Sequence, residues 1–365
     1  MADEDRESPA RAAGEPMETG SGTGEMRLAR DPIEARRKVS VPETTALFLV
    51  LVVLLAFFSV FAPYFIRDPS GNLTADNLIN ILQNAARIGI IACPATLLMI
   101  SGQFDLSVGS IAAFTAMVMA LAAAPTGGLL KLPMAFGLPI ELAVVIAILF
   151  AVLVGVINGI CVTVFRINAL ITTLGTLAIF RGLTKVLGDA QTIRIDGFGA
   201  LGTTRILGLP IPVYIFAIVV VVFFVILRYT TYGRSMYAIG ASPTAARLAG
   251  IRTKRAVFIA FLMSAGLAGL AGLILLSQVG GASVTADIGL ELSVVTAVVL
   301  GGTSLSGGRG GIVGTILAVL IIGVLGNGLV QMRIQPFWID VANGLLLLIA
   351  VGFDQLRVRL TSSID

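Results

Sequence analysis

The chain contains 365 residues, of which 56% are hydrophobic and only 13% are charged, and its mean hydropathy is +0.97. Because soluble domains carry about a quarter charged residues, this composition excludes a soluble domain and predicts an all-α polytopic membrane protein. The chain has no histidine, which excludes histidine-based triads, zinc sites and imidazole relays. Cys93 and Cys161 both fall in apolar stretches and are interpreted as small core residues. No metal and no cofactor are expected.

The formal net charge is +4, and basic residues cluster at the ends of the apolar stretches. Such clusters report membrane orientation, so the expected surroundings are membrane lipid and not nucleic acid. Residues 1–42 are polar and are predicted to form a disordered cytoplasmic tail without the apolar core of a signal peptide. Residues 43–356 form the predicted transmembrane domain, and residues 357–365 a second cytoplasmic tail.

Stretches of about 20 apolar residues predict about ten transmembrane helices with both chain termini in the cytoplasm. The basic loops test this number, because positively charged loops remain on the cytoplasmic side. Two crossings within residues 78–124 place Arg309 and the basic segment 228–255 inside. The acidic pair Asp287 and Glu291 then faces the outside. The predicted spans cover residues 44–66, 78–124 (two crossings), 138–165, 167–187, 211–227, 256–279, 291–305, 312–330 and 337–353.

The longest polar interruption, residues 228–255, carries six basic residues and no acidic one. Ser242 can cap a helix whose first turn accommodates Pro243, so a short helix flanked by Gly240 and Gly250 is expected across the membrane surface. A rigid helix on the cytoplasmic side indicates a docking surface for a partner. The alternative is a solvated loop whose charges only set the topology, and the residues of the loop leave both interpretations open.

Residues 101–110, SGQFDLSVGS, form the least lipid-like run inside the predicted spans. Gly102 can end one helix, and Asp105 or Ser107 can cap the next. One interpretation is a simple cap at a cytoplasmic turn. The other is a discontinuous helix whose polar start lines a water-filled path. The choice depends on the depth of Asp105 in the membrane, which the residues leave open.

Several other polar side chains lie in or beside the spans. Thr172 and Thr176 share one helical face, and hydroxyl residues in membrane helices commonly support close packing. Arg181, near the end of the same span, is expected to extend toward the outer lipid headgroups. Asparagines in the spans are interpreted either as contacts between helices or as partners for solute hydroxyls. The candidate substrate path comprises Asp105, Ser107, Asn158, Asn168, Thr172, Thr176 and Asn327.

Residues 301–311, GGTSLSGGRGG, are rich in glycine but lack the G-K-[ST] ending and the preceding strand of a phosphate-binding loop. A tight turn between two spans is favoured over a substrate contact. No nucleotide-binding motif occurs elsewhere in the sequence, so any ATP hydrolysis that drives transport must come from a separate polypeptide.

An internal repeat is suggested by two short echoes in the sequence. Asn158-Gly159 resembles Asn327-Gly328, and residues 174–180 resemble residues 314–320. Because the two echoes have different offsets along the chain, the sequence does not establish a repeat.

Taken together, these stretches resemble the permease subunits of ribose/xylose/galactose-type bacterial ABC importers. The resemblance covers nearly everything from residue 44 to residue 357. Its motifs are FDLSVGS (104–110), ITTLGTLAIFRGLT (171–184), YGRSMYAIGASPTAARLAGI (232–251), LELSVVTAVVLGGTSLSGGRGGIVGT (290–315) and the segment 337–351. Four positions depart from the family pattern. Gln103 stands where glycine is usual, Ser242 where asparagine is frequent, and Pro243 and Thr244 where acidic residues are frequent.

The resemblance implies a multi-pass transport subunit of the bacterial cell membrane that carries a monosaccharide or related polyol and has no catalytic residues of its own. It implies three kinds of partner: cytoplasmic ATPase subunits, a second permease copy or paralogue, and an extracytoplasmic sugar-binding protein. The segment 240–251 matches the loop expected to dock into the ATPase. The matching positions are Gly240, Ala245, Ala246, Arg247, Leu248 and Gly250.

Two other classes of function are alternatives. An ion-coupled secondary transporter of a small polar solute would need buried acidic residues paired for a relay. The acidic residues Asp105, Glu141, Glu291 and Asp340 instead lie near predicted span ends. A membrane enzyme would need a catalytic constellation, which a chain without histidine and with few intramembrane charges offers poorly.

Overall fold

The computed structural model describes residues 43–62, 64–67, 70–125, 135–335 and 337–362, so the predicted tail 1–42 lies outside the described residues. Within these residues, seven helices are long and apolar enough to cross a membrane, and three shorter apolar helices accompany them. The chain is therefore an all-α polytopic membrane protein, as predicted. Every predicted span overlaps one of these helices. The number of crossings and the cytoplasmic position of the termini stay predictions.

The helices and strands have the following bounds. The long apolar helices are α1 (Glu43–Phe61), α2 (Asp76–Ile100), α4 (Ile140–Thr163), α5 (Ala169–Leu187), α7 (Ile211–Tyr229), α10 (Thr253–Val279) and α12 (Ile312–Gln331). The other helices are α3 (Val108–Ala123), α6 (Ala200–Thr203), α8 (Thr231–Ala241), α9 (Pro243–Leu248), α11 (Leu290–Leu300) and α13 (Phe337–Ser362). The strands are β1 (Ile193–Arg194), β2 (Arg205–Ile206), β3 (Leu209–Pro210) and β4 (Gly281–Ala282).

Local chemistry sets several helix ends. The side chain of Asn168 caps α5 by accepting from the backbone N–H groups of Leu170 and Ile171. Gly102 lies two residues after the end of α2 with φ of +75°, and Gly280 ends α10 with φ of +71°. These left-handed conformations are accessible to glycine at little cost, so the two helices stop where the sequence allows the chain to turn.

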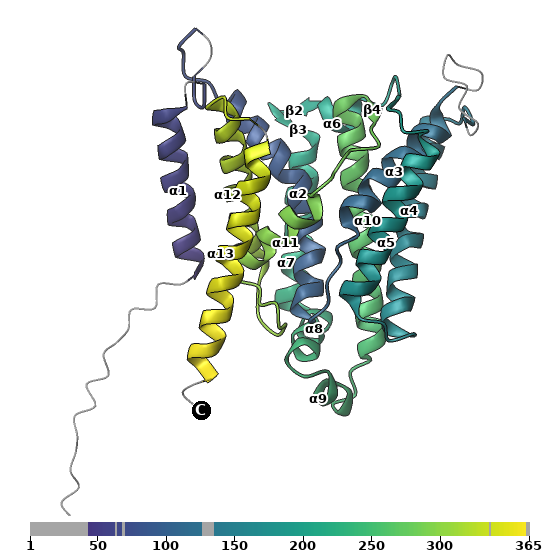
Figure 1. Ribbon diagram of the computed structural model, residues 1–365, viewed down its shortest axis with the longest axis vertical. Coiled ribbons are helices and arrows are strands. Elements are labelled where there is room, and N and C mark those ends of the chain that lie inside the picture. Colours follow the sequence, from purple (N-terminus) through teal and green to yellow (C-terminus); the bar gives the residue numbers. More distant parts are fainter. Residues whose placement is uncertain (1–42, 63, 68–69, 126–134, 336, 363–365) are drawn as a thin grey trace, which may run out of the picture. The chain divides into compact units, whose positions relative to one another are not determined.

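The same order of elements occurs twice along the chain. A long helix, a break, a short helix and two further helices form α2–α5, and the order returns in α10–α13. Figure 1 shows that the two sets run in opposite directions, since α2 descends toward α9 and α10 rises away from it. The echoed pairs Asn158-Gly159 and Asn327-Gly328 lie in the corresponding helices α4 and α12. The fold therefore contains the inverted repeat that the sequence left unestablished.

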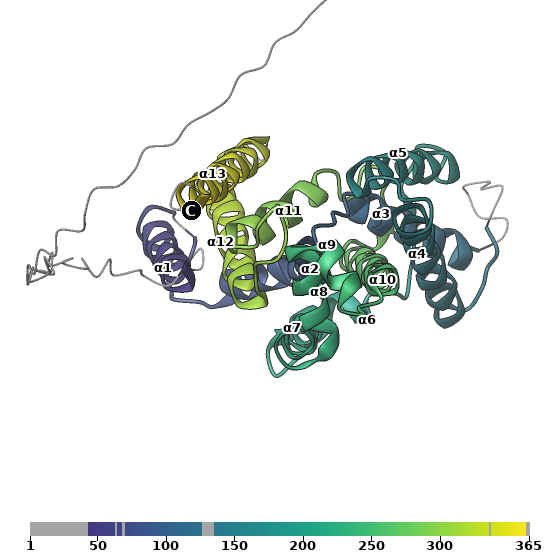
Figure 2. The same cartoon turned by 90° about the horizontal axis from the view of Figure 1, so that it is seen from below.

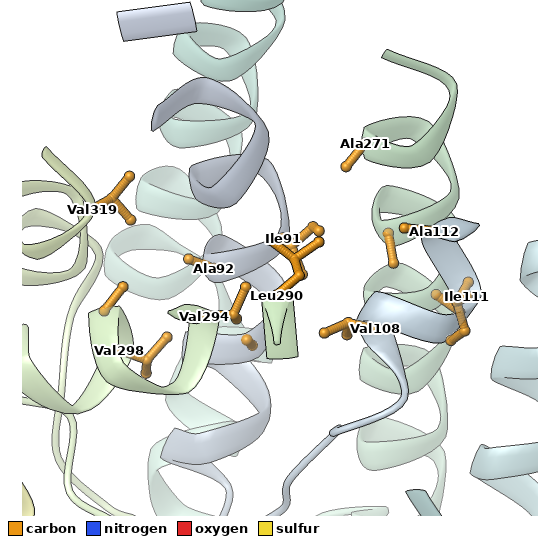
Figure 3. Packing of buried hydrophobic residues seen from close by; sticks show 14 of the residues in the cluster. Ile91, Ala92, Val108, Ile111, Ala112, Ala271, Leu290, Val294, Val298 and Val319 are labelled. Carbon is orange, nitrogen blue, oxygen red and sulfur yellow. The ribbon is translucent and has the colours of Figure 1, made fainter. Parts of the chain in front are cut away.

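The long first helix of each repeat packs on the other repeat. Helix α10 lies against α3 and α4, whereas α2 lies against α11 and α12, and α2 and α10 touch each other between the two groups. Figure 2 shows the two groups side by side. Buried Ile91 of α2, Val108 of α3, Ala271 of α10 and Val294 of α11 belong to one core cluster, and Figure 3 shows them at close range. The breaks before α3 and α11 thus lie in the core that joins the repeats.

Helices α8 and α9 mark one end of the helix bundle, which we call the α9 end. The first turn of α1 and the last turns of α13 lie at the same end (Figure 1). Helix α13 continues to Ser362, beyond the expected membrane boundary at residue 356. At the opposite end, β1 pairs antiparallel with β4, which joins the loop after α5 to the loop after α10. Helix α6 and the β2–β3 pair lie at this opposite end too.

Candidate functional site

Helix α9 forms within the basic segment where the sequence predicts it. The Ser242 hydroxyl caps the helix by accepting from the N–H of Ala245 at 3.2 Å. Ala245, Arg247 and Leu248 are exposed, and Leu248 is 86% exposed, whereas Ala246 is buried. An exposed leucine beside an arginine on a capped helix forms a small, rigid surface suited to contact with another protein.

Gly240 does not flank α9 but lies in the last turn of α8, where three stretches of backbone meet. A Cβ atom on Gly240 would overlap the carbonyl oxygen of Ile100 and the amide nitrogen of Gly308. The N–H of Gly308 donates to that same Ile100 oxygen at 2.8 Å. A Cβ atom on Gly307 would lie 2.9 Å from the amide nitrogen of Gly102. We call residues 100–102, 240 and 307–308 the glycine junction. It brings α8 into contact with the break after α2 and with the loop between α11 and α12.

The break between α2 and α3 carries a buried polar network. The Asp105 carboxyl group accepts from the backbone N–H of Ser107 at 3.0 Å and from the Ser107 hydroxyl at 2.5 Å. Its other oxygen accepts from the Ser264 hydroxyl of α10 at 2.7 Å. The Asn158 amide of α4 donates to the Ser107 oxygen at 2.9 Å. These four side chains are buried and join the break to α4 and α10.

The position of this network decides between the two interpretations of the break. Helix α2 runs the full length of the bundle to the α9 end, and the chain then rises in extended form to the start of α3 within the bundle (Figure 1). Asp105 lies beside Ser264, near the middle of α10, and not at a turn on the surface. Ser107 is the N-cap residue of α3, yet its side chain does not cap the helix. The geometry is that of a discontinuous helix.

The candidate residues in α5 do not join this network. Asn168 is exposed and serves as the N-cap described above. The Thr176 hydroxyl donates to the backbone oxygens of Thr172 and Thr173, both at 3.2 Å, as expected of a packing residue. Within the described residues, the buried Thr172 hydroxyl and the buried Asn158 carbonyl oxygen have no hydrogen-bond partner. These two atoms therefore have unused capacity for water or a solute.

Asn327 forms a reciprocal amide pair at the end of the bundle opposite α9. Its side chain and that of Asn77 exchange two hydrogen bonds, at 2.8 and 2.9 Å. The Gln331 amide also donates to Asn77, at 2.9 Å. These bonds tie the start of α2 to the end of α12. Asn327 thus lies far along the bundle from Asp105, and it borders a separate cavity.

This cavity, which we call the outer cavity, has a volume of about 530 Å³ and lies between α2, α11, α12 and α13. The volume is within the range of about 300–1,000 Å³ that is typical of small-molecule sites. Its walls combine apolar side chains with groups that can donate to or accept from hydroxyls. The polar side chains that line it are Asn84, Arg87, Asp287, Ser293, Asn327, Asp340 and Asn343.

A buried ion pair in the wall of the outer cavity was not identified from the sequence. The Arg87 guanidinium donates to the Asp287 carboxylate at 2.7 Å, and the Asp287 side chain is 1% exposed. Within the described residues, Arg87 Nε and Asp287 Oδ2 remain without partners. The sequence contained a sign of this pair, because Arg87 lies inside a predicted membrane span. A charged side chain there costs free energy and therefore indicates a functional site.

The expectation for Arg181 was wrong, whereas the outward side of the membrane expected for Asp287 and Glu291 stays a prediction. The chain before α11 enters the bundle, where the Asp287 side chain is 1% exposed and one carboxylate oxygen of Glu291 is buried. Arg181 does not extend to lipid headgroups. Its guanidinium donates to the backbone oxygens of Ala286 at 2.5 Å and Asp287 at 3.1 Å. Arg181 and Arg87 therefore hold the break before α11 from two sides.

Broken apolar helices around buried polar groups, together with a polar cavity between helices, define a polytopic transport protein. The chain belongs to the family described as branched-chain amino acid transport system / permease component, whose model matches residues 77–351. It is therefore a multi-pass permease of the bacterial cell membrane and one component of a transport system, and the resemblance to the ABC importer permeases is confirmed.

Three relatives show the extent of the similarity. The chain is 39% identical to the ribose import permease protein of Bacillus subtilis and 36% identical to that of Haemophilus influenzae, in each case over 84% of this chain and 91% of the relative. It is 36% identical to the L-arabinose transport system permease protein of Escherichia coli, over 86% of this chain and 90% of the relative. No solved structure matches the chain.

Proposed function

We propose that this chain is the membrane permease of an ABC importer for a monosaccharide or related polyol, that it has no enzymatic activity, and that separate ATPase subunits hydrolyse the ATP. Relatives named as ribose and L-arabinose permeases, aligned over more than four-fifths of the chain, support the solute class. The geometric observation that carries the proposal is the link from exposed α9, through α8 and the glycine junction, to the break before α3 and to the loop after α11. A permease worked by an external motor needs such a link.

In this proposal the α9 end faces the cytoplasm. The exposed arginines Arg228, Arg234 and Arg247 lie in this part of the chain, as the positive-inside rule expects. The ATPase contacts Ala245, Arg247 and Leu248, while Ala246 seats α9 on the permease. Gly250, with φ of +83°, turns the chain from α9 toward α10. Closure of the ATPases moves α8 and α9, and the glycine junction carries the motion to the break before α3 and to the loop after α11.

Charge reversal at α9 tests the docking surface. We expect Arg247→Glu to insert into the membrane normally, because the side chain is exposed and bonds only within α9, to Pro243 and Thr244. The association of the permease with its ATPase is expected to weaken by about tenfold or more. The negative side chain would either face an acidic group of the ATPase that Arg247 contacts or remain without a partner in the interface. Co-purification of the ATPase and radiolabelled uptake in cells measure the two effects.

Arg166→Glu is the matched control for this test, because Arg166 is also an exposed arginine but lies in the loop before α5. Its effect on ATPase association is expected to be small. Wild-type co-purification and uptake in Arg247→Glu would show that α9 is not the docking surface.

The solute path in this proposal begins at the outer cavity and passes the network around Asp105. The outer cavity offers amides, hydroxyls and a charged pair with unused atoms, which is the chemistry that binds a polyhydroxylated solute. Binding within the permease is expected to be weak, because a tight site would trap the solute, and selectivity comes mainly from the extracytoplasmic binding protein. A second permease copy or paralogue completes the transporter.

The ion pair of the outer cavity provides a prediction on stability and uptake. Asp287→Asn leaves the partly buried Arg87 guanidinium without its counter-ion, and the free energy of unfolding is expected to decrease by about 3 kcal/mol. Uptake is expected to fall strongly. Asp340→Asn is the control, because Asp340 lines the same cavity but is exposed. Thermal unfolding in detergent and vesicle uptake are the measurements.

The double variant Arg87→Gln/Asp287→Asn separates a structural role of the pair from a role in the solute path. Removing both charges is expected to restore most of the lost stability. If the pair contacts the solute, uptake remains low although stability recovers. Recovery of uptake together with stability would show that the pair only supports the fold.

The alternatives of ion-coupled transport and of catalysis have direct tests. Collapse of the ion gradient at constant ATP stops a secondary transporter at once, whereas an ABC importer continues. Chemical analysis of the solute recovered from vesicles distinguishes transport from catalysis, because an importer releases it unmodified. The relatives' names favour the ABC importer over both alternatives.

A further inference from the structure

A second cavity, of about 570 Å³, lies at the α9 end between the start of α1, the end of α7, α8 and the start of α12. We call it the basic cavity. Three arginines line it: Arg228 from the last turn of α7, Arg234 from α8, and Arg309 from the loop between α11 and α12. In the described part of the chain, no acidic side chain lines the basic cavity and none of the three guanidinium groups forms an ion pair. Three cations that line one cavity without a counter-ion indicate a site for an anion.

The wall of the basic cavity is built by close backbone packing. Tyr237 of α8 donates its hydroxyl to the backbone oxygen of Gly310 at 2.8 Å, which fixes the Arg309 loop against α8. Burial raises the pKa of the Tyr237 hydroxyl, with Arg228 acting in the opposite direction, so this donor keeps its proton at neutral pH. Gly310 has φ of +141°, and a Cβ atom there would collide with the Thr303 side chain. The loop is therefore held in one compact conformation.

Backbone donors add to the charges of the arginines. The first turn of α12 borders the cavity with Ile312, Val313 and Gly314. No side chain caps this helix, whose N-cap residue is Gly311. The first N–H groups of a helix have no partner within the helix, and they favour an anion at this position. The lining thus combines guanidinium forks with backbone N–H groups, a donor set that matches the oxygens of a phosphate group.

The surroundings of the basic cavity are apolar. Phe224 and Leu227 of α7 line it beside Arg228, and Phe224 belongs to a helix whose Ile218 and Val221 are more than half exposed. Helix α1, which contributes Thr44, also exposes its apolar side chains, and both α1 and α7 pack on α12. Helix α9 projects beyond the first turn of α1 (Figure 1), so the basic cavity lies closer to the apolar helices than the surface assigned to the ATPase. Cations next to exposed hydrocarbon match an ion with an acyl chain.

We propose that the basic cavity binds the phosphate-bearing headgroup of an anionic phospholipid from the leaflet at the α9 end. Basic pockets between membrane helices on the cytoplasmic side are suited to such headgroups. Only the assignment to the cytoplasmic leaflet rests on the proposed function; the binding itself does not. A bound headgroup bridges α7, α8 and the Arg309 loop, which carries residues 307–308 of the glycine junction. Its occupancy is therefore expected to support the coupling of α8 to the broken helices.

The test compares lipid retention by the purified permease in nanodiscs. Wild-type permease is prepared in phosphatidylcholine with a minor fraction of phosphatidylglycerol, and native mass spectrometry after release counts the retained phosphatidylglycerol. The variant Arg228→Gln/Arg309→Gln is expected to lower the apparent affinity for phosphatidylglycerol by about tenfold or more, on the basis of roughly fivefold for each basic residue. Arg166→Gln/Arg252→Gln removes two exposed arginines outside the cavity and is expected to leave retention unchanged.

Equal retention by wild type and the first double variant overturns the proposal. Arg234→Gln alone, at an exposed side chain, provides a second measurement if the double variant does not purify as a monodisperse protein. Inorganic phosphate is the competing probe: if it displaces the lipid or stabilises the protein without lipid as strongly as phosphatidylglycerol does, the source is free phosphate and the lipid assignment is wrong. Nanodiscs have no sidedness, so this result is independent of Arg247→Glu, which tests the ATPase surface.

Discussion

Replacement of Gly240 by alanine is expected to abolish most solute uptake while the permease still inserts into the membrane. The added methyl group has no space, because it would overlap the carbonyl oxygen of Ile100 and the amide nitrogen of Gly308. These are backbone atoms and cannot rotate away, so α8 must move from the glycine junction. Overpacking of this kind costs about 1–3 kcal/mol. A fall in uptake of about tenfold or more is expected, measured with radiolabelled solute at matched expression.

Gly182→Ala is the matched control for the glycine junction. Gly182 also lies within a helix, α5, and a Cβ atom there would meet nothing within 4 Å. Both substitutions have the same effect on intrinsic helix propensity, in which alanine exceeds glycine by about 1 kcal/mol. The control is therefore expected to keep wild-type uptake. Retained co-purification of the ATPase by Gly240→Ala would place the defect in transmission and not in docking. Wild-type uptake by Gly240→Ala contradicts the proposed link.

Substitution of Asp105 by alanine is expected to eliminate uptake and to destabilise the permease. The change removes the acceptor of three hydrogen bonds, from the Ser107 amide, the Ser107 hydroxyl and the Ser264 hydroxyl. Each buried donor left without a partner costs about 1–3 kcal/mol, partly offset because a buried carboxyl group no longer needs to be desolvated. A net decrease of about 2 kcal/mol in the free energy of unfolding is expected. Thermal unfolding and uptake report the two effects.

Asp105→Asn tests whether uptake depends on the shape of the side chain at position 105 or on its carboxyl group. Its amide oxygen can still accept from the Ser107 backbone, while its NH₂ group cannot accept from Ser264. Partial uptake is therefore expected. Glu141→Ala is the control, since Glu141 is an exposed acidic residue in the first turn of α4. Unchanged uptake in Asp105→Ala would remove the network from the solute path and leave it as a packing feature.

The first helix of each repeat packs on the other repeat, and this packing gives the polar network around Asp105 a role in helix motion. Because α10 packs on α3 and α4, Ser264 and Asn158 reach the break before α3 from different sides. In the second repeat, Arg87 of α2 and Arg181 of α5 hold the corresponding break before α11. Each break is thus held by side chains from helices that can move relative to one another. Such discontinuous helices are the elements that inverted-repeat transporters use for alternating access.

The sequence by itself determined the class of the protein and its local structure. Composition alone required a membrane protein, since so few charged residues cannot cover a soluble surface. The length of apolar stretches located the long helices, because the thickness of the bilayer sets the number of residues that must be apolar. The Ser242 cap and Pro243 predicted α9, since a helix start depends on residues a few positions apart. Each of these features follows from neighbours along the chain.

Only the tertiary structure decided how the site is assembled. Asp105 and Ser264 are 159 positions apart in sequence, and Arg87 and Asp287 are 200 positions apart, so no local pattern pairs them. The role of Gly240 was expected to be in docking, whereas its lack of a side chain is required by contact with Ile100 and Gly308. The burial of Asp287 was not predicted, because loop charge predicts the side of a membrane and not whether a loop re-enters the bundle. Contacts between distant residues arise when helices pack, and packing depends on the shape of every neighbour at once.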